Sequence, residues 1–484
     1  MRRPGEPSSA IPRHRPLRRL LLVGVLCALA AAAGAWCRGT YGARAVADEP
    51  QYLLSAISIA EDGDLDISDE LAAQRWRAFH EGQLPEQTQP LPDGRRVSPH
   101  DPLLPLLLAL PMAAGGWLGA KLALAVLAGV LGAATAWVAV RRFGVPAGVA
   151  SLAAVVFGAS MPLASYGNQV YPELPAALAV VVAVGALTGP LRRGGVWALG
   201  AAVIALPWLA VKYTPVAAVL ALLGLVRLWR TPGRQGDRET AAGGRGSRWV
   251  AVGLAGGLAV AGVAFLAIHK AVYTGWTPYA AGDFFYAEGG FAVGRVFGLQ
   301  PNYVARSQRL AGLLVGRKFG IAAWQPAWLL VVPALGALVR ARPAGWHVLA
   351  ATIAVGWLNA TFLALTAQGY WAPGRQVVVI LGPAVVVIAW WAGRLRAVRL
   401  LTALGLLGVA SYLWLAVETS VGPLRLIIDW FDTANPIYRA WRWALPDYVA
   451  PSVWTWPLHW LWVGLLLGLL TLGWRREGIG VRSP

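Results

Sequence analysis

The sequence is poor in cysteine, in histidine motifs and above all in charge. Only 13% of its 484 residues are charged, whereas soluble domains carry roughly a quarter, so a soluble globular protein is excluded. Cys27 and Cys37 are the two cysteines, and ten residues along one helix would separate them by about 15 Å, too far for a disulfide. Six scattered histidines without an HExxH motif argue against a dedicated histidine-bound metal site.

Long apolar runs take the place of charge. Hydrophobic residues make up 57% of the chain, and runs of near-spanning length recur along it. We predict an all-α integral membrane protein with about 12 transmembrane helices. Pro207 and Pro215 flank Lys212 and predict a kinked pair in the middle of the chain. The expected helices cover residues 19–37, 117–140, 145–165, 172–190, 195–211, 213–229, 249–268, 322–340, 345–365, 376–393, 400–418 and 457–473.

The net charge of +19 comes from basic residues that collect in alternate segments between the apolar runs. With the N-terminus inside, the inner segments hold 24 basic and 4 acidic residues, and the outer segments hold 17 basic and 19 acidic residues. The positive-inside rule therefore predicts a multi-pass plasma-membrane protein with both termini in the cytoplasm. The basic excess indicates topology and attraction to anionic membrane lipid, and nucleic acid is not an expected partner. A cleaved signal peptide is the alternative for the first span, which has a basic start and an alanine-rich end.

The loops are unequal in length, which predicts that the protein works on its outer face. Inner links are mostly a few residues, whereas three outer segments are long and are expected to carry juxtamembrane helices: 38–101, 269–320 and 419–456. The expected organisation is a basic cytoplasmic tail at 1–18, a transmembrane module at 19–393 and C-terminal transmembrane helices at 394–484.

The first outer loop holds 12 of the 23 acidic residues. Asp48 and Glu49 follow the first span, and apolar residues at helical spacing over 51–60 predict an amphipathic helix flat on the membrane surface. This helix would hold both carboxylates at the height of the head of a lipid-linked substrate. Ordinary surface acids are the alternative.

The acidic run 61–70 resembles part of a calcium-binding loop. Ile67 stands where that loop needs a glycine for its sharp turn, and Ala73 stands where it needs a bidentate glutamate. A turn followed by the start of a helix explains the run better.

Further polar residues mark a second acidic or acceptor site on the outer face. Glu173 follows Tyr171 and Pro172 in the first turn of an apolar helix, where an ionisable group is a functional candidate and pairing with the helix dipole is the alternative. His100 and Asp101 close the first loop.

Four of the outer basic residues are candidates for binding an anion, because the positive-inside rule disfavours them at these positions: Lys212, Arg317, Lys318 and Arg375. Snorkelling to lipid headgroups is the alternative for Lys212. Arg375 lies in a Gly/Pro turn between aromatic residues, and a guanidinium in a fixed turn suits phosphate oxygens.

Several short segments together resemble one family of enzymes. Asp48–Leu54, followed by Asp62–Asp66, is similar to the first external loop of bacterial polytopic glycosyltransferases of the GT-C class, relatives of protein O-mannosyltransferases and the lipid A aminoarabinose transferase. Tyr171–Ala177, Pro207–Leu209 and Pro373–Arg375 resemble later segments of the same proteins. Ala47 departs from the expected glycine before the acidic pair, and Gln51 stands where many relatives have histidine.

The resemblance implies a catalytic carboxylate at Asp48 first and Glu49 second. It also implies a sugar donor carried on polyprenyl phosphate, inversion at the anomeric carbon, and an extracytoplasmic protein, glycan or glycolipid as acceptor. The departing phosphate needs fixed cations, for which Arg375, Lys212, Arg317 and Lys318 are the candidates. No cofactor is assigned, but some members of the class use a divalent metal, for which His100, Asp101 and Glu173 are candidate ligands.

Two other classes of function stay open at this point. One is a twelve-span solute transporter or lipid flippase, although no two-half repeat is visible and only Lys121 lies as a clear charge within a span. The other is a non-catalytic scaffold in envelope assembly, for which the acidic first loop would be a protein-binding surface.

Overall fold

The computed structural model describes residues 14–39, 43–85, 87–230, 243–282, 302–364, 367–426 and 430–479. Within these residues the regular structure is helical, and the β-type pairing is limited to two isolated bridges, Asp66 with Val97 and Thr88 with Gly282. This confirms the all-α prediction. Part of the predicted outer loop 269–320 lies outside the described residues, and so does most of the predicted tail 1–18.

Every predicted apolar run contains helix, and six helices in the described ranges are long and apolar enough to cross a membrane. Five other apolar helices have 10–17 residues, about 15–25 Å at 1.5 Å per residue, which is less than the hydrocarbon core of a bilayer. The helices thus indicate a membrane protein, while the count of about 12 spans stays a prediction. The helices in the predicted runs are α1 (His14–Ala33), α4 (Leu103–Phe143), α5 (Ala147–Gly158), α7 (Glu173–Leu187), α8 (Arg193–Leu209), α9 (Thr214–Arg230), α10 (Gly243–Tyr273), α15 (Val331–Ala341), α16 (Trp346–Leu358), α17 (Val378–Arg394), α18 (Val398–Val421) and α20 (Thr455–Ile479).

Two predicted helices are broken where proline starts a new element. The run 145–165 ends its first helix at Gly158, and α6 (Leu163–Tyr166) begins after Pro162. The run 322–340 divides into α14 (Ile321–Trp324), η5 (Pro326–Leu330) and α15. Proline lacks an amide hydrogen and has a fixed φ, so it favours the first position of a helix over its interior.

Helix α4 is longer than predicted. It begins at Leu103 instead of residue 117 and continues through a kink at Gly115 and Gly116, whose φ values are −145° and 60°. Glycine accepts this backbone geometry without steric cost. The kink therefore separates a short outer piece from the predicted span.

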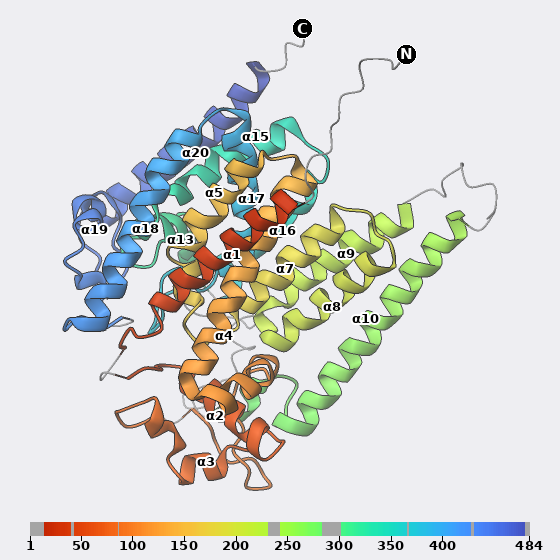
Figure 1. The fold of residues 1–484 in the computed structure, drawn as a ribbon, viewed down its shortest axis with the longest axis vertical. Coiled ribbons are helices and arrows are strands. Elements are labelled where there is room, and N and C mark those ends of the chain that lie inside the picture. Colours follow the sequence, from red (N-terminus) through yellow and green to blue (C-terminus); the bar gives the residue numbers. More distant parts are fainter. Residues whose placement is uncertain are drawn as a thin grey trace, which may run out of the picture.

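Helix α17 forms the centre of the bundle (Figure 1). All residues from Val378 to Ala392 are buried, and the helix packs against α4, α5, α7, α15 and α16. Helix α10 at the edge of the bundle is the opposite case, with 11% of its most apolar window buried. An apolar helix with exposed faces is typical of contact with lipid.

The first outer loop carries α2 (Glu49–Glu61), α3 (Ser68–Ala72) and η2 (Arg75–Ala78). Figure 1 places α2 and α3 at the opposite end of the molecule from the start of α1 and the end of α20, as expected for an outer loop. Helix α2 lies where predicted but does not lie flat on a surface. It packs against α4, and its polar residues Gln51 and Ser55 are buried along with its apolar ones.

Candidate active site

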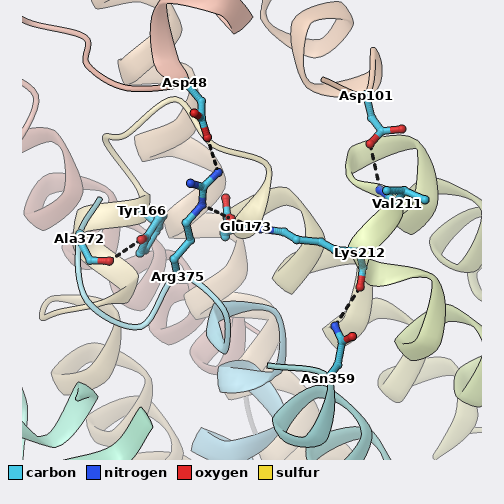
Figure 2. Close-up of polar contacts among 9 residues, drawn as sticks. All are labelled: Asp48, Asp101, Tyr166, Glu173, Val211, Lys212, Asn359, Ala372 and Arg375. Carbon is cyan, nitrogen blue, oxygen red and sulfur yellow. Dashed lines mark hydrogen bonds and ion pairs between the residues drawn. The ribbon is translucent and has the colours of Figure 1, made fainter. Parts of the chain in front are cut away.

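Asp48 lies at the point where the backbone turns into α2. Its side chain makes no capping hydrogen bond to the helix, and its carboxylate points instead toward Arg375 (Figure 2). The preceding Ala47 has φ 54°, in the left-handed region that favours glycine. This backbone conformation explains why the sequence resemblance predicts glycine at this position. Ala47 adopts the same turn at a steric cost in free energy.

Arg375 joins two acidic residues that are far apart in the sequence. Its Nη2 atom donates to Asp48 Oδ2 at 2.7 Å, and its Nε atom donates to Glu173 Oε1 at 3.0 Å (Figure 2). The guanidinium also lies over the rings of Tyr171 and Trp371, at 4.2 and 4.7 Å from their centroids. Hydrogen bonds and ring contacts together fix the orientation of this side chain.

The turn that carries Arg375 depends on Gly374. This residue has φ 80°, and an added Cβ would come within 2.6 Å of Ile321 Cγ2. The hydroxyl of Tyr166 donates to the carbonyl of Ala372 at 2.6 Å and holds the start of the turn. Both the backbone conformation and the lack of space therefore require glycine beside Arg375.

Lys212 completes a chain of charges through Glu173. Its ammonium donates to Glu173 Oε1 at 2.6 Å, and Glu173 is fully buried in the first turn of α7. The kink predicted between Pro207 and Pro215 is the short helix η3 (Val211–Tyr213), which places Lys212 between α8 and α9. Asn359 donates to the Lys212 carbonyl at 2.9 Å and fixes this segment (Figure 2).

We call Asp48, Arg375, Glu173 and Lys212 the outer ion network. Two carboxylates and two cations balance, so the group brings no net charge into the protein. Burial raises the pKa of Asp48, but the charge and hydrogen bond of Arg375, together with the charges of His100 and Lys212, outweigh burial and hold that pKa below its ordinary value. Burial also opposes the charge of Arg375, whose pKa Asp48 and Glu173 nevertheless raise well above the usual value. Asp48 is therefore ionised at neutral pH.

Glu49, the second predicted catalytic carboxylate, does not face Arg375. Its Oε2 atom accepts the amide hydrogen of Val46 at 3.0 Å, and its Oε1 atom accepts that of Val170 at 2.7 Å. The side chain is 1% exposed, and burial raises its pKa. Glu49 thereby joins the turn before Asp48 to the segment that carries Tyr171 and leads into α7, where Glu173 is the first residue.

His100 and Asp101 lie close to the network but have partners of their own. His100 stacks on Tyr52 with 4.5 Å between ring centroids, and burial lowers its pKa to about 4, so it is neutral at pH 7. Asp101 accepts from the Val211 amide at 2.9 Å and contacts His269 Nε2 at 3.1 Å. Asp101 thus anchors the segment that carries Lys212.

The predicted metal ligands do not converge. In the described ranges, the one group of three or more acidic, histidine or cysteine side chains with ligand atoms close enough to share an ion is Asp62, Asp69 and Glu70. His100, Asp101 and Glu173 are not among them. Metal binding by these residues therefore stays a prediction.

Arg317 and Lys318 line a separate cavity of about 380 Å³. Arg317 donates from Nε to the carbonyls of Arg442 and Leu445, and the Lys318 ammonium lies 4.3 Å from the centroid of the Phe431 ring. The lining of this cavity includes no member of the outer ion network. The structure thus divides the four predicted phosphate-binding residues into two pairs.

Sequence reasoning missed two polar residues beside the network, Tyr213 and Asn359. In the described part of the chain, Glu173 Oε2 and the hydroxyls of Tyr171 and Tyr213 are buried without a hydrogen-bond partner. Buried polar atoms without a partner are uncommon in proteins, so these three call for an explanation. Tyr213 directly follows Lys212, and Asn359 is a lone amide inside an apolar run, so both carried a signal in the sequence that could have been used.

Comparison with known proteins gives one fold-level likeness. No protein-family model matches the chain, and no curated protein matches it by sequence. A search of solved structures finds the crystal structure of ArnT from Cupriavidus metallidurans bound to undecaprenyl phosphate, with a TM-score of 0.47 and 15% sequence identity. The match covers 95% of this chain and 77% of that one.

Proposed function

We propose that this protein is a membrane glycosyltransferase that moves a sugar from a polyprenyl-phosphate donor to an acceptor hydroxyl on the outer face of the membrane. The observation that carries the proposal is the contact between Asp48 and Arg375, which are 327 residues apart in the sequence. Transfer from a phosphate-linked sugar needs a carboxylate to take a proton and a cation to hold the phosphate. The resemblance of the surrounding segments to GT-C enzymes supports the same reaction.

In the proposed reaction, the acceptor oxygen attacks the anomeric carbon while its proton passes to Asp48. The bond between this carbon and the phosphate oxygen breaks, and polyprenyl phosphate leaves with the electron pair. Because attack and departure occur on opposite faces of the sugar, the anomeric configuration inverts.

Arg375 links donor binding to the basicity of Asp48. While the guanidinium faces Asp48, it lowers the pKa of this carboxylate and makes it a weak base. A donor phosphate that shares the charge of Arg375 weakens this effect, and the pKa of Asp48 rises. The base therefore gains strength when the donor is in place.

Lys212 and Glu49 act beside this pair. Lys212 neutralises Glu173 and so leaves Arg375 available to Asp48 and the phosphate. Glu49 holds the backbone before Asp48 through two amide hydrogen bonds, so we assign it a positioning role. Arg317 and Lys318 stay candidates for binding the phosphate of the donor or of an anionic acceptor, because both line the 380 Å³ cavity.

The proposed orientation has both termini in the cytoplasm and the outer ion network outside. Cysteine labelling with a membrane-impermeant reagent tests it. A cysteine in place of exposed Ala73, in the first outer loop, should react in intact cells, whereas one in place of exposed Arg141 should react only after lysis. The reverse pattern would overturn the orientation.

A deletion strain of the source organism tests the reaction. Mass analysis of its envelope glycans and lipid-linked sugars should show a missing sugar and an accumulated polyprenyl-phosphate donor. The wild-type gene should restore the sugar, and Asp48→Asn should not, although the variant reaches the membrane. Asp93→Asn is the matched control, because Asp93 lies in the same loop but pairs with Arg95 at an exposed site.

Restoration of the sugar by Asp48→Asn would reject the assignment of Asp48. An unchanged glycan profile in the deletion strain, together with counterflow of a labelled solute by the purified protein, would favour a transporter instead.

A further inference from the structure

Three acidic side chains of the first outer loop face one another away from the outer ion network. Asp62 caps the end of α2, and Asp69 and Glu70 lie in the first turn of α3. One carboxylate oxygen from each lies within 4.8 Å of those from the other two. The lower part of Figure 1 shows these two helices side by side.

Glu70 is the residue that makes this group unusual. It is 2% exposed, and neither of its carboxylate oxygens has a hydrogen-bond partner among the described residues. An ionised carboxylate is costly to bury without a partner. Asp62 and Asp69 each have a carboxylate oxygen within 4.8 Å of one of the Glu70 oxygens.

The nearby charged groups are already committed to other partners. Arg75 pairs with Glu61 at 2.7 Å. Asp64 accepts from the Ser58 hydroxyl and the Asp66 amide, and Asp66 accepts from Ser68 and from the Arg96 amide. These bonds hold the loop together, and none of these groups forms an ion pair with Asp62, Asp69 or Glu70 in the described part of the chain.

The geometry and the ligand type fit a calcium ion. Calcium takes six to eight oxygen ligands at about 2.3–2.6 Å, so two ligands on opposite sides of one ion lie about 4.8 Å apart. All three side chains offer oxygen, which calcium prefers and which disfavours softer metals. Asp62 and Asp69 are exposed, so water can fill the remaining positions.

We propose that Asp62, Asp69 and Glu70 bind one Ca²⁺ ion, which clamps the end of α2 to the start of α3. This set differs from the calcium-loop pattern that the sequence fails to complete, since two of its three ligands come from a separate helix. Because Asp48 immediately precedes α2, the clamp also steadies the segment that carries the carboxylate of the outer ion network. The ion would stabilise the loop whatever reaction that network performs.

Equilibrium binding of ⁴⁵Ca²⁺ tests the site directly. The full-length protein, purified in a neutral detergent and washed with chelator, should bind about one Ca²⁺ per chain at roughly 1 mM, the weak end of the range for extracellular sites. Excess Mg²⁺ in the buffer suppresses nonspecific binding. Glu70→Gln keeps the size of the side chain and should abolish binding, and exposed Asp62→Asn should weaken it at least tenfold.

Two matched measurements guard against an unfolded variant. Asp93→Asn in the same loop should bind calcium as the wild type does. Trypsin should cleave after exposed Arg77 faster in chelator than in calcium for the wild type, and equally fast in both for Glu70→Gln. The proposal is overturned if the wild type binds no calcium, or if Glu70→Gln binds it with unchanged affinity, as would follow from a proton shared between Glu70 and Asp69.

Discussion

The outer ion network differs from the acidic group of the first loop, Asp62, Asp69 and Glu70, in how the charges of its carboxylates are balanced. In the network, each carboxylate meets a cation within 3.0 Å, and four segments distant in sequence supply one charge each. In the acidic group, three carboxylates come from nine consecutive residues and face one another. The protein itself supplies the cations that balance the network, whereas the acidic group needs a cation from solution.

This difference predicts that the outer ion network depends on partners within the protein, whereas the acidic group depends on an ion from solution. A buried charge that loses its protein partner cannot recover it from the buffer, so substitutions in the network should be severe. The acidic group can exchange an ion with solvent, so its contribution should depend on that ion. Substitutions and solution conditions can therefore separate the two groups.

Arg375→Ala should strongly reduce catalysis. Removing the cation that faces the leaving phosphate should lower the transfer rate roughly 10²–10³-fold, and the KM for the donor should rise. A donor titration with the protein in proteoliposomes measures both. Arg95→Ala removes an exposed guanidinium from a pair with Asp93 and should leave both constants unchanged. An unaltered donor KM in Arg375→Ala would contradict the role in phosphate binding.

The largest expected effect on stability is that of Glu173→Gln. This change leaves Lys212 and Arg375 facing each other without their shared carboxylate and should cost about 3–5 kcal/mol. Glu61→Gln, at an exposed pair with Arg75, should change stability by no more than about 0.5 kcal/mol. Thermal unfolding in detergent compares them, and equal melting temperatures would show that the network does not stabilise the fold.

The contribution of His100 to the stability of the wild type should fall as the pH falls from 6.5 toward 4. The pKa of His100 is lowered from 6.5 to about 4, so in this range the unfolded chain binds a proton that the folded chain does not. Asp48 adds a further loss only below its unfolded value of 3.8, because its folded pKa is lowered. Relative to the wild type, the melting temperature of His100→Gln should therefore rise as the pH falls from 6.5 to 4, and a difference that stays constant over this range would exclude a contribution from His100.

The smallest effect is expected for Ala47→Gly. Glycine adopts the φ of 54° without steric cost, so this variant should gain up to about 1 kcal/mol and keep its activity. Ala73→Gly serves as the control, because exposed Ala73 has φ −77° and gains nothing from glycine. A melting temperature of Ala47→Gly below that of the wild type would show that this turn is not strained.

Much of the fold could be predicted because apolar runs and helices coincide in a membrane protein. Each predicted run contains a helix, and the kink around Lys212 was correctly predicted from its flanking prolines. The breaks at Pro162 and Pro326 and the extension of α4 to Leu103 were missed. An apolar stretch has the same composition whether one helix or several pieces fill it.

The site was harder to predict, because pairing depends on contacts between distant segments. The sequence indicated Asp48, Glu173, Lys212 and Arg375 one at a time, from their charge at the ends of apolar runs. It did not indicate that Glu173 joins the two cations, nor that Glu49 faces backbone amides instead of substrate. Adjacent carboxylates look alike in sequence, and the turn at Ala47 decides which of them faces Arg375.

The most direct test of the central claim is the transfer rate of Asp48→Asn in proteoliposomes that contain its labelled polyprenyl-phosphate donor and acceptor. Asparagine keeps the size of the side chain but cannot take the acceptor proton, so we expect the rate to fall about 10²–10⁴-fold while the protein stays folded. A variant that transfers sugar at the wild-type rate would contradict the account of Asp48 as the base.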